Sequence, residues 1–240
     1  MYLKVKNVIE DLTGFSFYRK NLPWGLNIYK DIKRLVPHWS PQVIFDVGAN
    51  MGQTAVAFHD VWPNAQIFSF EPVQNTFNVL EKSVDKLPNV KAVPLALGSA
   101  SGEATIKIFS NSRLASLDHE VSVRPAIKYE QIKISTVDEF CDLHSIDRVC
   151  FLKIDTEGHD LEVLKGSISY LKNSKIDFVL AEFSTTSMPG KVTITDIDEL
   201  LRKYDMTCVG IYDQAFWKDA NIYFGNVLFV REGLIFKSRN

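Results

Sequence analysis

The chain has 240 residues, of which 46% are hydrophobic and 23% charged, a composition typical of a folded domain and not of a disordered or fibrous protein. This length fits one large domain with a short extension and makes two equal domains a poor fit. The 27 basic and 29 acidic side chains give a formal net charge of -2, so no overall charge attracts the chain to nucleic acid or to an anionic membrane.

The cysteines and the first residues bear on the compartment of the protein. Cys141, Cys150 and Cys208 are odd in number and lack metal-ligand spacing, which favours reduced core residues over a disulfide framework. Charged residues interrupt residues 1–20, so this segment does not resemble a signal peptide, and no apolar run approaches the length needed to cross a bilayer. We therefore expect a cytoplasmic protein without an integral membrane segment.

The first 40 residues follow a different pattern from the rest of the chain. Within them, residues 26–36 carry apolar side chains at helical spacing, and prolines stand on either side. From Val43 onward, short apolar runs alternate with amphipathic stretches. We therefore expect an N-terminal helical extension over residues 1–40 and one α/β domain over residues 41–240.

The alternating pattern of the α/β domain predicts seven strands and four helices. The strands are expected at Val43–Val47, Gln66–Phe70, Lys91–Pro94, Val149–Ile154, Phe178–Glu182, Thr207–Ile211 and Asn226–Val230. The helices are expected near residues 52–60, 73–86, 159–172 and 195–204. This alternation is typical of a doubly wound, Rossmann-like α/β fold with a mostly parallel seven-stranded sheet.

One interval, between residues 102 and 149, departs from this alternation. Ala104–Phe109 and Gln131–Ser135 alternate apolar and polar residues in the manner of an antiparallel pair, and Thr136–His144 has the pattern of a short helix. We expect a β-hairpin insertion that shapes the substrate side of the domain.

A glycine loop follows the first strand, at the position where doubly wound folds bind a nucleotide cofactor. Gly48 permits a tight turn, Asn50 follows, and Gly52 lets the next helix start close to the ligand. Asp46, near the strand end, would repel a pyrophosphate but could attract the ammonium group of a methionine moiety, directly or through water. These four residues therefore predict a cofactor loop for S-adenosylmethionine in preference to a dinucleotide.

An acid at the end of the second strand supports this prediction. Glu71 lies about 20 residues beyond the loop, where such folds keep a carboxylate that binds ribose. Pro72 suits the first position of the following helix, which would hold Glu71 beside the loop. Glutamate also caps many helices, but the loop and the spacing together favour binding of both ribose hydroxyls.

Four acidic or basic side chains follow the fourth strand. They are Asp155, Glu157, His159 and Asp160. Methyl transfer from a sulfonium to oxygen requires a hydroxyl to lose its proton, so a base beside the methyl group is useful. We predict catalytic roles for Asp155 and His159, since imidazole ordinarily titrates near pH 6.5 and Asp155 could orient the hydroxyl instead. Glu157 fits a helix cap, and we rank metal-free chemistry above a metal site because Lys153 can neutralise the acids.

In their order along the chain, several motifs resemble the FkbM family of methyltransferases. They are Phe45-Asp-Val-Gly-Ala-Asn-Met-Gly52, Phe70-Glu-Pro72, Ala96-Leu-Gly98 and the Lys-Ile-Asp-Thr-Glu-Gly segment within Leu152–Gly166. The resemblance covers roughly residues 40–232. It implies a class I methyltransferase fold, S-adenosylmethionine as donor, and O-methylation, often of sugar hydroxyls.

The same resemblance implies roles for particular residues. It places the cofactor loop at Asp46, Gly48, Asn50 and Gly52, the ribose acid at Glu71, and a strand-end motif at Asp155, Glu157 and Gly158. The expected acceptor is a small molecule or saccharide with a free hydroxyl, and not a nucleic acid. The sequence does not decide the oligomeric state.

Two alternatives stay open at this point. A nicotinamide-dependent oxidoreductase shares the glycine loop and the ribose acid, although Asn50 stands where its fingerprint needs a second glycine. A binding module without turnover could also keep this fold, because fold alone does not imply function.

Overall fold

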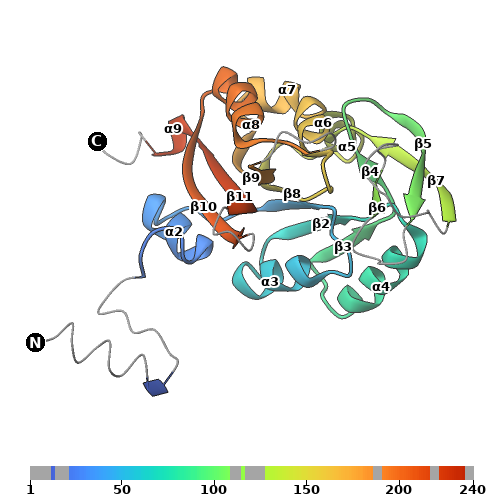
Figure 1. Cartoon of the computed structure of the whole chain (residues 1–240), viewed down its shortest axis with the longest axis horizontal. Helices are drawn as coiled ribbons and strands as arrows, with labels where there is room; N and C mark the ends of the chain where they lie inside the picture. The colour runs from blue at the N-terminus through green and yellow to red at the C-terminus, as the bar shows by residue number, and fades with distance from the viewer. Residues whose placement is uncertain are drawn as a thin grey trace, which may run out of the picture.

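A seven-stranded sheet forms the centre of the structure, a computed structural model that describes residues 12–13, 22–108, 115–116, 128–185, 191–216 and 222–235 (Figure 1). The strand order is β10-β11-β9-β8-β1-β2-β3. The strands are β1 (Val43–Val47), β2 (Gln66–Phe70), β3 (Val90–Val93), β8 (Val149–Ile154), β9 (Ile176–Ser184), β10 (Met206–Phe216) and β11 (Ile222–Arg231). The five neighbouring strands β9, β8, β1, β2 and β3 are parallel to one another. Strand β11 is antiparallel to both of its neighbours, β9 and β10. This confirms the predicted doubly wound, mostly parallel sheet.

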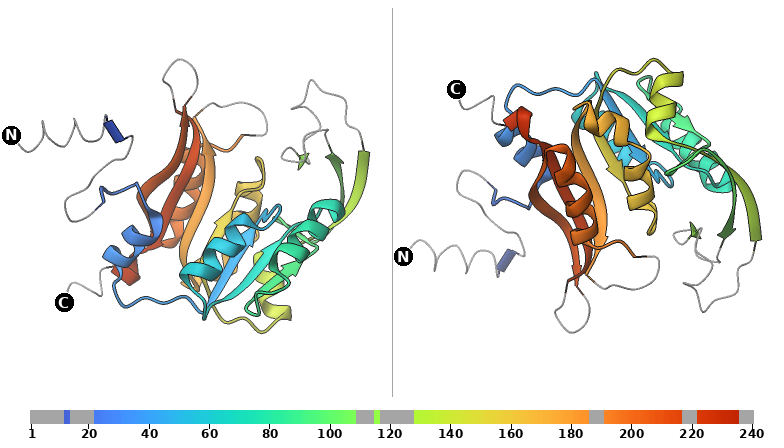
Figure 2. Two further views of the ribbon diagram at one scale, coloured as in Figure 1. Left: turned by 90° about the horizontal axis from the view of Figure 1, so that it is seen from below. Right: turned by 90° about the horizontal axis from the view of Figure 1, so that it is seen from above.

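Helices cover both faces of this sheet (Figure 2). One face carries α2 (Ile28–Leu35), α3 (Gln53–Val61) and α4 (Gln74–Val84), and the other carries α5 (Val137–Leu143), α6 (Asp160–Lys165), α7 (Ile168–Lys172) and α8 (Ile194–Leu201). A 3-10 turn, η1 (Arg202–Tyr204), follows α8, and α9 (Glu232–Ile235) follows β11. Because helices cover both faces, the central strands are buried on both sides. Successive side chains of a strand point to opposite faces, so nearly every position in β8 and β9 is apolar.

The helix expected over residues 159–172 is in fact two helices, α6 and α7. The break falls at Gly166, where an added Cβ would lie 2.0 Å from the carbonyl oxygen of Gly98. This close approach of another segment requires glycine at the point where α6 ends. The prediction of one helix was wrong because helical periodicity does not register a distant backbone contact.

Several strands also differ in length from their predicted bounds. The strand expected at Lys91–Pro94 starts and ends one residue earlier, and β10 and β11 both extend well beyond their predicted apolar runs. Antiparallel pairing extends the two strands to Phe216 and Ile222, beyond the apolar runs from which their bounds were predicted.

The insertion forms a second sheet of four strands, in the order β4-β7-β5-β6. Its strands are β4 (Ala96–Leu97), β5 (Gly102–Ile108), β6 (Ala115–Ser116) and β7 (Lys128–Ser135). The antiparallel pairing of β5 with β7 confirms the predicted hairpin, apart from Phe109, which lies outside the described residues. Ile106 and Ile132 pack against Val73 at the start of α4, so this sheet closes one side of the carboxyl edge of the main sheet.

The N-terminal helix α2 packs on the main sheet. Ile32 and Val36 join the core cluster that contains Ile44 of β1. Asp31, which is 1% exposed, accepts hydrogen bonds from the Gly25 amide at 2.8 Å and from the Tyr212 hydroxyl at 3.1 Å. These contacts fix α2 beside β10. In the parts of the chain that the structure describes, no helix is both long and apolar enough to span a membrane.

Candidate functional site

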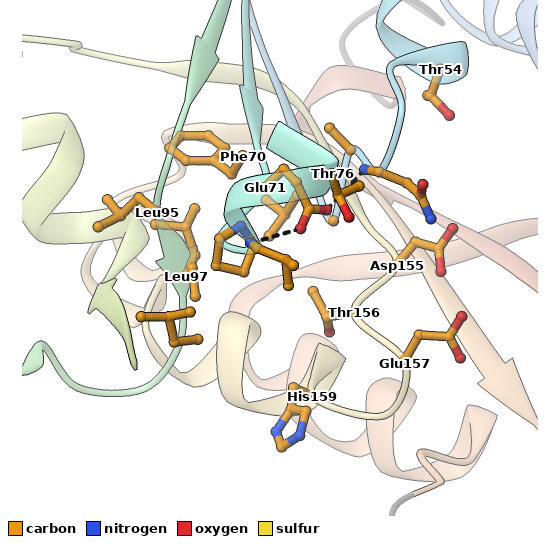
Figure 3. Close-up of a pocket in the computed structure, with 18 of the residues that line it drawn as sticks. Thr54, Phe70, Glu71, Thr76, Leu95, Leu97, Asp155, Thr156, Glu157 and His159 are labelled. Carbon is orange, nitrogen blue, oxygen red and sulfur yellow. Dashed lines mark hydrogen bonds between the residues drawn. The ribbon is translucent and has the colours of Figure 1, made fainter. Parts of the chain in front are cut away.

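A cavity of about 290 Å³ opens at the carboxyl edge of β1, β2 and β8 (Figure 3). Its walls come from the glycine loop after β1, the start of α4, the second sheet, and the turn between β8 and α6. Cofactors of doubly wound folds bind at this edge, and ligand pockets usually measure about 300–1,000 Å³. The cavity therefore has the place and nearly the size of a cofactor site.

The glycine loop has a conformation that depends on its sequence. Gly48 has φ +74°, and an added Cβ would lie only 1.9 Å from the carbonyl oxygen of Asp155. Asn50 also has positive φ, at 50°, a region that asparagine tolerates better than most residues. Gly48 and Asn50 line the cavity. The loop is thus wound tightly against the turn after β8.

Gly52, the last residue of the predicted cofactor loop, is the N-cap residue of α3. It lies outside the cavity wall, and its left-handed backbone, with φ +95°, faces helix α4. An added Cβ would approach Leu80 Cδ1 to 3.0 Å and Ser83 Cβ to 3.4 Å. Glycine at this position lets α3 start close to α4.

Asp46 also lies away from the cavity wall. It is fully buried, and its carboxylate forms an ion pair of 3.2 Å with Lys153 Nζ on the neighbouring strand β8, where the two residues are register partners. Burial raises the pKa of Asp46, and the charge of Lys153 opposes this rise. The expected contact of Asp46 with the ammonium group of a methionine moiety, directly or through water, stays a prediction, and the ammonium group beside Asp46 in this structure is that of Lys153.

Glu71 lies at the cavity wall, as the sequence predicted, and it also holds the start of α4. Its carboxylate accepts hydrogen bonds from the Asn50 amide at 3.1 Å and from the Val73 amide at 2.9 Å. The residue is 8% exposed, and burial raises the pKa of Glu71 to about 7. Each carboxylate oxygen can accept a further hydrogen bond, so the helix contact does not exclude a ribose.

The raised pKa of Glu71 predicts that donor binding depends on pH. Ribose hydroxyls donate best to the carboxylate, so affinity should increase as pH rises through about 7 and level off above it. From pH 8 to pH 6 the dissociation constant of S-adenosylhomocysteine should rise about tenfold. Calorimetry over this range is the measurement. In Glu71→Gln the affinity should be weaker and nearly independent of pH, and an unchanged pH profile in this variant would assign the dependence to another group.

The turn after β8 carries the two predicted catalytic residues, and both line the cavity. The Asp155 side chain is 41% exposed and lies 3.4 Å from Lys153 Nζ. His159 is the N-cap residue of α6. The two side chains do not point toward one another (Figure 3). They are therefore suited to separate tasks more than to a shared proton relay.

The remaining acids of this turn are divided between structure and cavity. Asp160 is 1% exposed and accepts hydrogen bonds from the Thr156 hydroxyl at 2.9 Å and from the Glu182 amide at 3.2 Å, so it ties the turn to β9. Glu157 lines the cavity at φ 53°. Burial, followed by repulsion from Asp155, Asp160 and Glu157, raises the pKa of Glu182 to about 8. Among the described residues, no group of three His, Cys, Asp or Glu side chains is arranged to hold a metal ion.

Sequence reasoning missed the apolar part of the cavity. Its wall includes Val73, Leu97, Ile106 and Ile132, from α4, β4, β5 and β7. The alternation of β5 and β7 marks an apolar face, but it does not identify the surface against which that face packs.

With this sheet order, and with the glycine loop and Glu71 at its carboxyl edge, the chain has a class I methyltransferase fold. Residues 46–207 match the methyltransferase FkbM domain, and the chain belongs to this methyltransferase family. The family uses S-adenosylmethionine, the cofactor that the sequence predicted.

Several characterised proteins are similar to this chain. Hexuronic acid methyltransferase AglP of Haloferax volcanii is 32% identical over 63% of this chain and 59% of its own length. Methyltransferase sdnD of Sordaria araneosa is 29% identical over 51% of this chain and 59% of its own length. The chain thus spans less than two thirds of the length of AglP and of sdnD. The 2-O-methyltransferase NoeI of Sinorhizobium fredii is 21% identical over 76% of this chain and 79% of its own. The METTL16 methyltransferase domain shares the fold, with a TM-score of 0.51 and 11% identity over 95% of this chain and 78% of that one.

Proposed function

We propose that this protein transfers a methyl group from S-adenosylmethionine to a hydroxyl oxygen of a saccharide or another small polyol. The observation that carries the proposal is one continuous cavity lined by the glycine loop, by Glu71 and by Asp155. The family supports methyl transfer, and the similarity to a hexuronic acid methyltransferase, AglP, and to a 2-O-methyltransferase, NoeI, supports a sugar-like acceptor and an oxygen target.

The residues of the cavity fit this donor. Asn50 lines the cavity, and its Oδ1 is buried without a hydrogen-bond partner in the described part of the chain. This oxygen could therefore accept a hydrogen bond from the ammonium group of the methionine moiety. Glu71 suits the ribose hydroxyls. The apolar wall of Val73, Leu97 and Ile132 suits the adenine ring, because an aromatic ring gains free energy from leaving water.

The chemistry that the donor supplies is a methyl group on a positive sulfonium, set for in-line transfer to oxygen. The protein then has to align the acceptor hydroxyl and receive its proton as the new C–O bond forms. Asp155 is our candidate for holding that hydroxyl, because its carboxylate is partly exposed and lines the cavity. His159, which also lines the cavity, is our candidate for the proton acceptor.

A labelled-methyl assay tests this proposal. The purified chain is incubated with S-adenosylmethionine carrying a labelled methyl group and with neutral sugars, hexuronic acids and polyols, and labelled products are identified by mass spectrometry. We expect an ether methyl group on a hydroxyl of at least one saccharide. Label found on nitrogen or carbon, or no transfer to any acceptor with a hydroxyl while the donor binds, would contradict the proposal.

A further inference from the structure

Lys153 is a buried cation that joins three parts of the site. Its ammonium group lies 3.2 Å from Asp46 Oδ1 on β1, 3.4 Å from Asp155 Oδ2 in the turn after β8, and 3.4 Å from the carbonyl oxygen of Gly48 in the glycine loop. The contact with the Gly48 carbonyl oxygen is a hydrogen bond that Lys153 donates, and the contacts with Asp46 and Asp155 are ion pairs. The side chain is 7% exposed.

The charge of Lys153 is stable in this position. Burial favours the neutral amine, but the carboxylates of Asp46 and Asp155 outweigh it and raise the pKa of Lys153. Its two carboxylate neighbours therefore favour the charged form of Lys153, and its three contacts suit a role in holding neighbouring groups in place.

A second contact joins the same two segments. The Cα of Gly48 packs against the backbone of Asp155 so closely that a Cβ would meet its carbonyl oxygen at 1.9 Å and its carbonyl carbon at 2.8 Å. The glycine loop and the turn after β8 thus meet through backbone packing and through the Lys153 ammonium. A displacement of one segment is opposed by contacts with the other.

We propose that Lys153 is a positioning residue that fastens the glycine loop to the turn carrying Asp155, so that donor binding at the loop fixes the Asp155 carboxylate in the cavity. This inference rests on the proposed function, which places the donor at the loop and the acceptor hydroxyl at Asp155. The simpler explanation is that Lys153 only neutralises Asp46, and the two explanations predict different behaviour in a charge-balanced variant.

The test compares wild type, Asp46→Asn, and the double variant Asp46→Asn/Lys153→Met. Lys153→Met alone would leave Asp46 buried and unpaired and should lower the melting temperature by roughly 6–20 °C. The double variant removes both buried charges and should recover most of that loss. Hydrogen exchange of residues 155–159 is followed with and without saturating S-adenosylhomocysteine, and calorimetry reports binding of the same compound.

In wild type and in Asp46→Asn, S-adenosylhomocysteine should slow exchange in this turn by about tenfold or more. In the double variant the ligand should still protect the glycine loop, but protection of the turn should be lost, with affinity reduced roughly 2- to 30-fold. Asp155→Ala breaks the same link from a partly exposed position, where folding is not at risk, and should also lose protection of the turn.

The outcomes separate the two proposals. If S-adenosylhomocysteine binds and protects the turn equally in wild type, the double variant and Asp155→Ala, Lys153 is only a counter-ion and the inference is overturned. If the compound does not bind wild type, calorimetry shows this directly, and the proposed function fails together with the inference.

Discussion

Asp155→Asn should lower turnover by roughly 10²- to 10⁴-fold, the contribution of a well-positioned group that orients or deprotonates a reacting hydroxyl. The substitution preserves the shape of the side chain and removes its charge. Because Asp155 is 41% exposed at the cavity, the fold should tolerate the change. Turnover with saturating donor and an identified acceptor, together with the affinity for S-adenosylhomocysteine, is the measurement.

Affinity for the donor should stay within about threefold of wild type in this variant, since the proposed task of Asp155 concerns the acceptor. Asp147→Asn is a matched control. Asp147 stands just before the other end of β8, is 88% exposed and forms an ion pair with Lys175, so its loss should leave turnover unchanged. A wild-type rate for Asp155→Asn would make the acid structural, and a loss confined to donor affinity would assign it to the cofactor.

The second large effect is expected for Gly48→Ala, which should destabilise the fold by more than about 4 kcal/mol and abolish donor binding. The added Cβ would lie 1.9 Å from the Asp155 carbonyl oxygen, and φ +74° is itself unfavourable for alanine by about 1–2 kcal/mol. A flexible side chain could move away, but a backbone carbonyl at the end of β8 cannot move without breaking the sheet. Urea denaturation and calorimetry with S-adenosylhomocysteine are the measurements.

Gly98→Ala provides the control for this prediction. Gly98 is not among the glycines with a left-handed backbone, and an added Cβ would meet only the Ile134 side chain, at 3.1 Å. Its stability should change by less than about 1 kcal/mol. Gly48→Ala with wild-type stability and affinity would show that the loop and the turn are not in the contact described above.

Local sequence patterns were sufficient to predict most of the strands and part of the candidate site. The apolar runs mark the strands because strands covered on both faces need apolar residues throughout, and glycine marks the loop because its backbone angles exclude most other residues. Glu71 could be placed at the cavity because a strand end and a helix start fix its position from both sides.

The rest of the site depends on contacts between distant segments, which no local pattern contains. Asp46 and Lys153 become partners only through the register of β1 with β8. The contact of Gly52 with α4 depends on how the two helices pack, and the closure of the cavity by Ile106 and Ile132 depends on where the second sheet docks. The sequence showed which residues were chemically unusual, but not what each of them faces.

The central claim, that this cavity binds a methyl donor and not a dinucleotide, is tested most directly by calorimetric titration of the purified chain with S-adenosylhomocysteine and, in parallel, with NAD. We expect one site per chain for S-adenosylhomocysteine with a dissociation constant in the micromolar range, about -8 kcal/mol, and no measurable heat with NAD. Binding of NAD without binding of S-adenosylhomocysteine would contradict the account.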